Sequence, residues 1–270
     1  MQEPIQLPKI SQSLIKAFYD YVQEKECGIY FDERYIKKNP KTEKEPTDAM
    51  MLGIYFEYLC LGTIPRNGII PEPQYSYKGT AREKLAEPYL RAQQGAETFK
   101  AVMQHYGIKI VKTNYYLETK DRENGLLDAI IEFNGEQAIL DLKRSGLIND
   151  KWSELGWEME SLPMKDSIMI QPVHYKLLAR KELKIEDMPF YFYVADEKDP
   201  NNARFIRVEV DESKMQAHEV LINNLKGRLI AEMKKGFTPL PDLERCNKCP
   251  LRDECAYATK VPIVQEVYYG

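Results

Sequence analysis

The stretch "GLLDAIIEFNGEQAILDLK", residues 125–143, decides the fold. Two apolar runs flank Asn134-Gly135, a pair typical of a two-residue type I′ turn between antiparallel strands. That turn makes Phe133 face Glu136, and the same register carried outward makes Asp128 face Asp141. The pattern therefore predicts a hairpin with two aspartates opposite each other, in a non-hydrogen-bonded pair where side chains approach most closely.

These two aspartates share their face of the hairpin with Lys143, because side chains two residues apart on a strand point the same way. Like charges that face each other across a strand pair are destabilising, so something should offset the repulsion. Mg²⁺ or Mn²⁺ would do so, since hard cations take carboxylate oxygens and keep waters for a substrate. A lysine beside such an ion can orient or deprotonate an attacking water, or stabilise charge on a reacting phosphate. The alternative is a solvated polar face where Lys143 simply pairs with both aspartates.

The remaining pattern predicts mixed secondary structure around this hairpin. Helices are expected over 11–25, from Thr47 or Asp48 to Gly62, over 80–106 with a kink or restart at Pro88, over 168–183 and over 213–235. The second of these helices is apolar almost all round, which indicates burial. Strands are expected within 108–143 and in the runs "FYFYVAD" and "ARFIRVEV", while 30–46, 63–78 and 144–166 are expected to be connections. This order favours an α/β or α+β core wrapped by helices.

Composition excludes several classes of protein. The 270 residues carry a net charge of −4, which argues against a broadly basic coat for nucleic acid but leaves room for a local basic groove. No apolar run approaches the roughly 18 residues that span a bilayer, and the first residues lack the apolar core of a signal peptide. We expect a soluble cytoplasmic protein that makes no membrane contact.

Cysteines supply the second signal. Three of the five lie in "RCNKCPLRDEC" with the spacing Cys-x₂-Cys-x₅-Cys, at Cys246, Cys249 and Cys255. Tetrahedral thiolate sites bind zinc or iron–sulfur clusters, and three thiolates leave one position vacant. None of the three histidines of the chain is near in sequence, so the fourth ligand has to come from Cys27 or Cys60.

Taken together, these motifs resemble the PD-(D/E)XK nuclease superfamily. An aspartate followed by Asp-x-Lys across a hairpin is similar to its core, and Gln171 and Tyr175 resemble the Gln-x-x-x-Tyr helix of its RecB-like branch. Members of that branch carry an upstream Gly-x-x-x-His helix with a metal-binding histidine, whereas this chain reads Gly53-Ile-Tyr-Phe-Glu57. Glutamate is still a ligand for Mg²⁺ or Mn²⁺.

The cysteine pattern resembles the iron–sulfur members of that branch, namely the CRISPR-associated 4Fe–4S exonucleases and the AddB nuclease domain. In those proteins a Ser-x-Ser-x-hydrophobic helix leads to Cys-Pro, and here Ser11-Gln-Ser13-Leu14 leads to Cys27-Gly28. The resemblance thus implies a 4Fe–4S cluster held by Cys27 and the three C-terminal cysteines, with Cys60 outside it. Such a cluster would close a loop of about 219 residues and stabilise the fold. Zinc in the same thiolates, or reduced cysteines without a metal, are the alternatives.

The resemblance runs from Ser11 to Cys255 and implies a restriction-endonuclease-like fold with a central mixed sheet flanked by helices. The chain would be a single nuclease domain over 1–270, with a nuclease core at 46–235 and an iron–sulfur subdomain of 1–30 plus 236–260. By the family's pattern, one or two Mg²⁺ or Mn²⁺ ions would be bound by Glu57, Asp128, Asp141 and the carbonyl of Leu142. Lys143 would activate or position water, and Gln171 and Tyr175 would position the lysine and the DNA backbone.

The implied function is metal-dependent hydrolysis of phosphodiester bonds in DNA, by an exonuclease acting on single strands or DNA ends. Trp152 and Trp157 in the long connection could stack on unpaired bases or merely cover the core. A catalytically impaired DNA-binding or assembly subunit of the same fold is the alternative that Glu57 invites. A zinc-ribbon-like interaction protein would explain only the last thirty residues. The chain has no Gly-x₄-Gly-Lys loop, so a helicase or another CRISPR or recombination partner would be a separate chain.

Overall fold

The structure, a computed structural model, describes residues 6–43, 45–65, 68–146, 152–153, 156–157 and 166–258. It divides into two compact units. Unit 1 comprises residues 1–45 and 220–270, and unit 2 comprises residues 46–219. The boundary falls inside one long helix, whereas the sequence pattern placed it after that helix, at 235.

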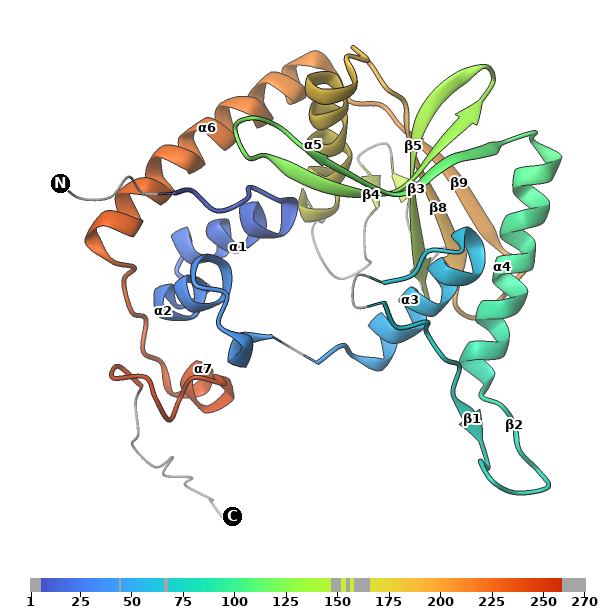
Figure 1. Ribbon diagram of the computed structural model, residues 1–270, viewed down its shortest axis with the longest axis horizontal. Helices are drawn as coiled ribbons and strands as arrows, with labels where there is room; N and C mark the ends of the chain where they lie inside the picture. Colours follow the sequence, from blue (N-terminus) through green and yellow to red (C-terminus); the bar gives the residue numbers. More distant parts are fainter. Residues whose placement is uncertain are drawn as a thin grey trace, which may run out of the picture. The chain divides into compact units, whose positions relative to one another are not determined.

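The elements are shown in Figure 1. Among the described residues the helices are α1 (Gln12–Val22), α2 (Gly28–Phe31), α3 (Asp48–Leu61), α4 (Glu87–His105), α5 (Asp166–Leu183), α6 (Glu212–Lys235) and α7 (Leu243–Lys248), with a π-helical turn η1 (Asp32–Ile36) and a 3₁₀ turn η2 (Pro40–Thr42). The strands are β1 (Tyr75–Ser76), β2 (Lys84–Leu85), β3 (Lys109–Glu118), β4 (Asn124–Phe133), β5 (Glu136–Ser145), β6 (Trp152–Ser153), β7 (Gly156–Trp157), β8 (Phe190–Asp196) and β9 (Ala203–Val208).

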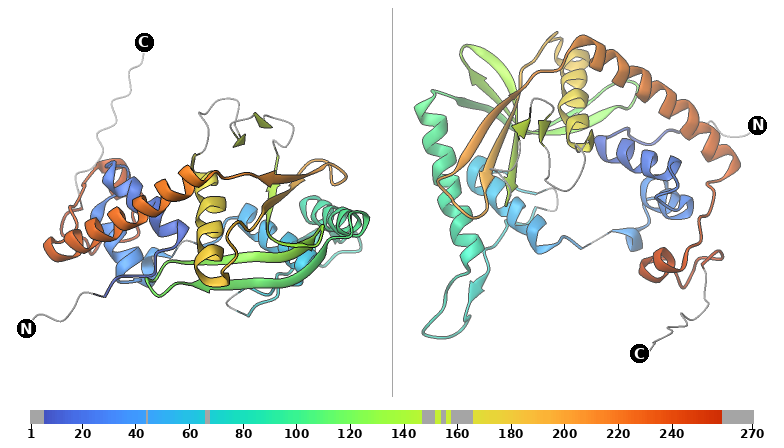
Figure 2. Two further views of the ribbon diagram at one scale, coloured as in Figure 1. Left: turned by 90° about the horizontal axis from the view of Figure 1, so that it is seen from above. Right: turned by 180° about the vertical axis from the view of Figure 1, so that it is seen from behind.

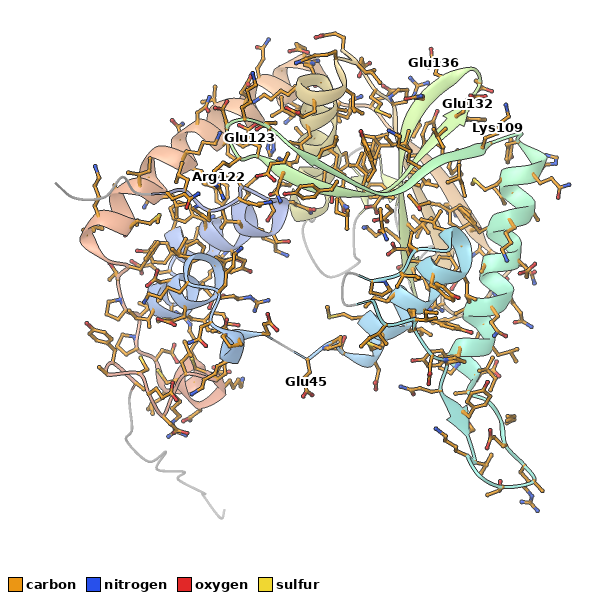
Figure 3. All side chains as sticks on the ribbon, in the orientation of Figure 1. Glu45, Lys109, Arg122, Glu123, Glu132 and Glu136 are labelled. Carbon is orange, nitrogen blue, oxygen red and sulfur yellow. The ribbon has the colours of Figure 1, made fainter. Side chains whose placement is uncertain are left out.

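Unit 2 is built on a five-stranded mixed sheet of order β3-β4-β5-β8-β9. The pair β5–β8 is parallel and the other neighbours are antiparallel. A parallel pair needs a crossover connection, and the segment between β5 and β8 contains α5. On the antiparallel side, Lys109 of β3 and Glu132 of β4 form an exposed ion pair across the strands (Figure 3).

The sheet carries an apolar core on each face. One core joins α3 and α4 to the sheet and centres on Phe56, Phe99 and Tyr193. The other joins α5 to the opposite face and centres on Leu178 and Phe190. Figures 1 and 2 show α4 and α5 on the two sides of the strands. The mixed α/β architecture that the sequence predicted is therefore confirmed.

The central hairpin has the predicted register. Phe133 pairs with Glu136 and Ala129 pairs with Leu140. Asn134 and Gly135 both have positive φ, at 53° and 81°, as a type I′ turn requires. The local turn chemistry therefore agrees with the alignment of β4 and β5 in the fold.

The expected helix over 80–106 begins only at Glu87, so that prediction was wrong at its start. Pro88 occupies the first turn of α4, where the missing N–H is no loss. The residues before it form the short strand pair β1–β2, in which Tyr75 pairs with Leu85. The expectation that α3 is buried holds for one part of the helix: Tyr55, Phe56 and Cys60 are buried on it, and its other residues are partly or fully exposed. Its start was right, because the hydroxyl of Thr47 accepts from Met50 N–H.

In unit 1, the segment 30–46 was expected to be a loop, but α2 and η1 run continuously over 28–36. The physical reason is an aromatic cluster, because tertiary packing can stabilise a helix too short to form alone. Phe31 packs against Phe18 of α1, Tyr35 and Phe237 at ring-centroid distances of 5.2–5.5 Å. The helix expected over 11–25 is α1, and Ser11 is its N-cap.

Candidate active site and cysteine cavity

The hairpin register carries Asp128 and Asp141 to neighbouring positions of β4 and β5. The backbone N–H of Leu142 donates a hydrogen bond of 2.8 Å to Asp128 Oδ2, which places the Asp128 carboxylate against β5. Asp128 is half-buried and Asp141 is fully covered. The two carboxylates that the sequence predicted to face each other thus lie side by side within unit 2.

Lys143 and Gln171 both contact Asp141. The Lys143 ammonium forms an ion pair with Asp141 Oδ2. The side-chain amide of Gln171, from α5, donates a hydrogen bond to Asp141 Oδ1. Lys143 Nζ also lies 5.7 Å from the centre of the Phe192 ring. Gln171 therefore fixes the carboxylate from above the sheet, while the lysine stays half-exposed beside it.

Glu57 belongs to the same electrostatic group, although it comes from α3. Its Oε1 accepts a hydrogen bond of 3.1 Å from the hydroxyl of Thr63. Burial raises the pKa of Glu57, and the negative charge of Asp141 raises this pKa further. The sequence pattern did not single out Thr63, because nothing in a loop threonine marks it as a partner of a helix residue.

The aspartates have perturbed pKa values for the same two reasons. Burial raises the pKa of Asp128 well above its ordinary value, and the charges of Asp141 and Glu57 add to this rise. Burial also raises the pKa of Asp141, against the opposing effect of Lys143. Burial by itself lowers the pKa of Lys143, but the surrounding carboxylates outweigh it and raise this pKa. Such a concentration of charge, held out of water, is typical of functional sites.

The donor atoms of these side chains are of the type that binds a hard cation. Asp141 Oδ2 is buried, and the Lys143 ammonium is the cation that contacts it. Among the residues that the structure describes, however, no three His, Cys, Asp or Glu side chains are arranged to hold a metal ion. The donors are carboxylate oxygens, which are the ligands that Mg²⁺ and Mn²⁺ prefer.

Tyr175 shares the α5 face of Gln171 but packs into the core. Its ring centre lies 6.5 Å from that of Phe190. It also covers Gly125, where an added Cβ would be 2.7 Å from Tyr175 Cε1. Its role in positioning the lysine and the DNA stays a prediction. Trp152 and Trp157 face each other in the strand pair β6–β7, and their side chains lie outside the described residues.

A buried histidine pair next to Gln171 was missed by the sequence reasoning. His174 Nε2 lies 3.1 Å from the carbonyl of Asn124, so this nitrogen carries the proton and Nδ1 accepts from His218 Nε2 at 3.2 Å. Burial lowers the pKa of each histidine to about 4. Both are therefore neutral at pH 7 and anchor α5 to β4 and to α6. Their wide separation in sequence left no signal for the pair.

In unit 1, the cysteines meet around one cavity. Cys27, Cys246, Cys249 and Cys255 all line this cavity, which has a volume of about 210 Å³. All four are half-buried. Burial raises the pKa of the Cys249 thiol, and the other three cysteines add to that rise. Cys60, by contrast, is buried in the apolar core of unit 2.

Backbone contacts hold Cys27 at this cavity. The N–H of Leu240 donates to Cys27 Sγ at 3.4 Å. The next residue, Gly28, donates its N–H to the carbonyl of Thr238 at 3.1 Å. An added Cβ on Gly28 would lie 2.3 Å from that oxygen, so only glycine permits this approach. Arg245 also lines the cavity, and its Nη1 is buried without a hydrogen-bond partner among the described residues.

Fold and site together define a mixed α/β protein with a charged cluster at one sheet and a cysteine-lined cavity. No protein-family model matches the sequence, and no curated protein matches it. The fold is similar to a crystal structure from Eubacterium rectale described as "Putative exonuclease", with a TM-score of 0.62 and 19% identity over 97% of both chains. A second structure, SSO0001, gives a TM-score of 0.25 at 13% identity over 62% of this chain and 68% of that chain. At this level of identity the first similarity shows the fold alone.

In the part of the chain that the structure describes, no helix is both long and apolar enough to traverse a bilayer.

Proposed function

We propose that this chain is a metal-dependent DNA nuclease, an exonuclease that hydrolyses phosphodiester bonds in single-stranded DNA or at DNA ends. The observation that carries the proposal is the cluster of Asp128, Asp141 and Lys143 on one face of β4 and β5, with Gln171 bonded to Asp141. An ion pair to a buried carboxylate is weak evidence for stability, since apolar side chains would often serve stability as well. It is better explained by chemistry on a charged substrate.

The ligands for one or two Mg²⁺ or Mn²⁺ ions would be Glu57, Asp128, Asp141 and the Leu142 carbonyl. The bound cation would supply the positive charge that offsets the phosphate's negative charge in the transition state. It would also relieve the repulsion among the three carboxylates, for which Lys143 supplies a positive charge and neighbouring N–H and hydroxyl groups supply hydrogen bonds. The glutamate in place of the family's histidine keeps the donor set hard, as Mg²⁺ prefers.

Hydrolysis requires a water oxygen to attack phosphorus while the bond to the leaving sugar oxygen breaks and that oxygen gains a proton. Lys143 would hold its positive charge beside the reacting phosphate and orient the attacking water. Gln171 would act through Asp141, by keeping that carboxylate in one orientation. Tyr175 would act indirectly on the site, because its packing holds α5, and with it Gln171, against the sheet.

We also propose that the cysteine cavity of unit 1 binds a structural 4Fe–4S cluster. A structural zinc ion is enclosed directly by its four ligands, with Zn–S bonds of about 2.3 Å. The cavity of about 210 Å³, which the four cysteines line together with other side chains, has room for a polyatomic cluster instead. The N–H of Leu240 aimed at Cys27 Sγ and the unpartnered Arg245 Nη1 would both favour the negative charge of thiolate-bound iron.

A second candidate function is a DNA-binding or assembly subunit that keeps this fold without catalysis. The arrangement of Glu57 favours it, because this carboxylate is hydrogen-bonded to Thr63 and the described carboxylates do not converge as the ligands of one ion. Such a subunit would work with a helicase or with a CRISPR or recombination partner on a separate chain.

The two candidates separate in one experiment. End-labelled single- and double-stranded DNA is incubated with anaerobically purified protein in Mn²⁺, Mg²⁺ or EDTA, and Lys143→Ala is run beside wild type. We expect metal-dependent cleavage by the wild type and a loss of about a hundredfold to a thousandfold or more in the variant. Lys109→Ala, which removes an exposed strand lysine of the same sheet, is the matched control and should cleave normally. Absence of cleavage by an iron-loaded, folded wild type would favour the binding subunit.

A further inference from the structure

A strand pair projects from unit 2 as an arm, which we define as residues 74–86. Its base is closed by the N–H of Ala86, which donates to the carbonyl of Gln74 at 2.8 Å. Figures 1 and 2 show the arm extending beyond the first turn of α4, away from the five-stranded sheet. An isolated two-stranded hairpin is at best marginally stable in water, so the arm needs a reason other than core formation.

Two aromatic rings of this arm are exposed to solvent. Tyr75 is 46% exposed and Tyr77 is 64% exposed, while the arm's Leu85 packs against the core. Single apolar residues on a surface need no explanation, but two exposed aromatic side chains, two residues apart on a projecting arm, offer ring surface to a partner. Aromatic faces of this kind are what unpaired bases stack on.

The arm is also locally basic in a chain of net negative charge. The side chains of Lys78, Arg82 and Lys84 are exposed, and none of them forms an ion pair among the residues that the structure describes. The one acid in the arm, Glu83, is also exposed, and its Oε2 accepts a hydrogen bond of 2.6 Å from Gly79 N–H, so the arm carries three cations against one carboxylate. The arm therefore presents unpaired positive charge to the solvent.

The tip is ordered by its own hydrogen bonds at the expense of an unfavourable backbone conformation. Thr80 Oγ1 donates a hydrogen bond of 2.7 Å to the carbonyl of Tyr77. The carbonyl of Thr80 accepts a hydrogen bond of 3.0 Å from Glu83 N–H, which closes a turn. Tyr77 itself has φ at 57°, a left-handed conformation that is rare for a bulky side chain. Glycine or asparagine would adopt this backbone conformation at a lower cost in folding free energy. The tyrosine at this position therefore points to a role other than stability.

We propose that the arm is a contact for single-stranded nucleic acid, with its two tyrosines stacking on unpaired bases and its three cations contacting phosphates. The inference rests on the proposed function, for which it names the form of substrate. A combination of a basic strip with aromatic rings is the usual means of binding a single strand without sequence preference.

The test measures binding apart from cleavage. The full chain is titrated into fluorescently labelled oligothymidylate in EDTA, and affinity is read by anisotropy over a range of salt concentrations. We expect Tyr77→Gly to weaken binding by about 5- to 100-fold, as loss of one stacked base does. The same variant should unfold at an unchanged or higher temperature, because glycine adopts this φ without strain. Tyr77→Asn, which keeps a Cβ and tolerates the conformation, should weaken binding likewise.

Two further proteins sharpen the result. Tyr106→Ala removes a ring that is 56% exposed elsewhere on unit 2, and it should bind as the wild type does. Replacing Lys78, Arg82 and Lys84 together by alanine should lower the slope of log affinity against log salt by up to about 2, given roughly 0.7 per phosphate contact on a single strand.

The outcomes separate this inference from the proposed function. If wild type binds and cleaves while the Tyr77 variants and the triple variant keep its affinity and salt slope, the arm has no such role and the nuclease proposal stands. If the wild type binds in an arm-dependent way but no metal ion supports cleavage, the arm is supported and the nuclease proposal fails.

Discussion

Asp128 and Asp141 lie on neighbouring strands of one hairpin, just beyond the pair Ala129–Leu140, whereas Cys27 and Cys246 reach one cavity from the two ends of the chain. The carboxylate site is fixed by strand pairing and by a turn of two residues. The cysteine cavity is fixed by aromatic packing in unit 1 and by a few backbone contacts around Gly28. The first site should therefore keep its shape when one side chain changes, while the second should depend on what binds there.

The largest difference is expected on removing one ligand of the cavity. Cys246→Ala should lose iron and reduce the free energy of unfolding by about 5 kcal/mol, because the cluster would no longer close the long loop between the chain ends. Iron content, visible absorption and urea unfolding measure this.

Cys60→Ala is the control for that experiment, since Cys60 is buried in the core of unit 2. It should keep its iron and lose only about 1 kcal/mol for the missing sulfur. An iron-loaded Cys246→Ala protein of wild-type stability would contradict the structural role of the cluster.

The next largest effect concerns unit 2, which contains the carboxylate site, and it is a dependence of stability on pH. The pKa of His174 and of His218 is lowered from 6.5 to about 4 by burial, so between these values the unfolded chain binds more protons than the folded one. Stability should therefore be present above about pH 6.5 and fall as the pH drops toward 4, by about 3 kcal/mol for the pair between about pH 7 and 5. Glu123, which opposes this shift, and Lys181, which adds to it, are the charged groups near the pair.

Urea unfolding of wild type and His218→Gln at both pH values tests this prediction. The variant should show a smaller fall in stability, because glutamine can donate to His174 Nδ1 but does not titrate. The variant His105→Gln changes an exposed histidine of α4, and its free energy of unfolding should fall as much as that of the wild type. Equal pH dependence in all three proteins would show that the buried pair does not control acid stability.

The smallest of the three effects concerns two glycines. Gly28→Ala should destabilise unit 1 by about 2 kcal/mol and lower its iron content, because the new methyl group would collide with the Thr238 carbonyl. Gly53→Ala, in α3, meets nothing within 4 Å and should stabilise that helix by about 0.5–1 kcal/mol. Thermal unfolding and iron analysis of the two variants measure these effects. Equal iron content in Gly28→Ala and Gly53→Ala would show that Gly28 does not position Cys27.

Several parts of the fold could be predicted because their signals are local. The turn at Asn134-Gly135 has few conformations available, and it sets the register that brings Asp128 to Asp141. The caps at Ser11 and Thr47 act on N–H groups three residues away, so the starts of α1 and α3 could be predicted closely. The similarity of fold to the Eubacterium rectale structure agrees with the mixed sheet expected from this order of elements.

Other parts could not be predicted, because long-range contacts decide them. The helical turns over 28–36 depend on rings from α1 and from Phe237, which no local window contains. The sequence pattern predicts a connection for the first part of the arm and helix from residue 80 on, because the strands of the arm are too short to leave a pattern of their own. The hydrogen bond from Thr63 to Glu57 and the histidine pair are likewise products of tertiary structure.

The sequence by itself determined the hairpin, its facing aspartates with Lys143, and the presence of three closely spaced cysteines, because each depends on residues within one turn or one strand pair. Tertiary structure decided that Gln171 reaches Asp141 and that Cys27, rather than Cys60, joins the cysteine cavity. The physical reason is that spacing along a chain limits only near neighbours. Which distant segments meet depends on the packing of the two cores and, around Cys27, on whether a glycine lets two backbones approach.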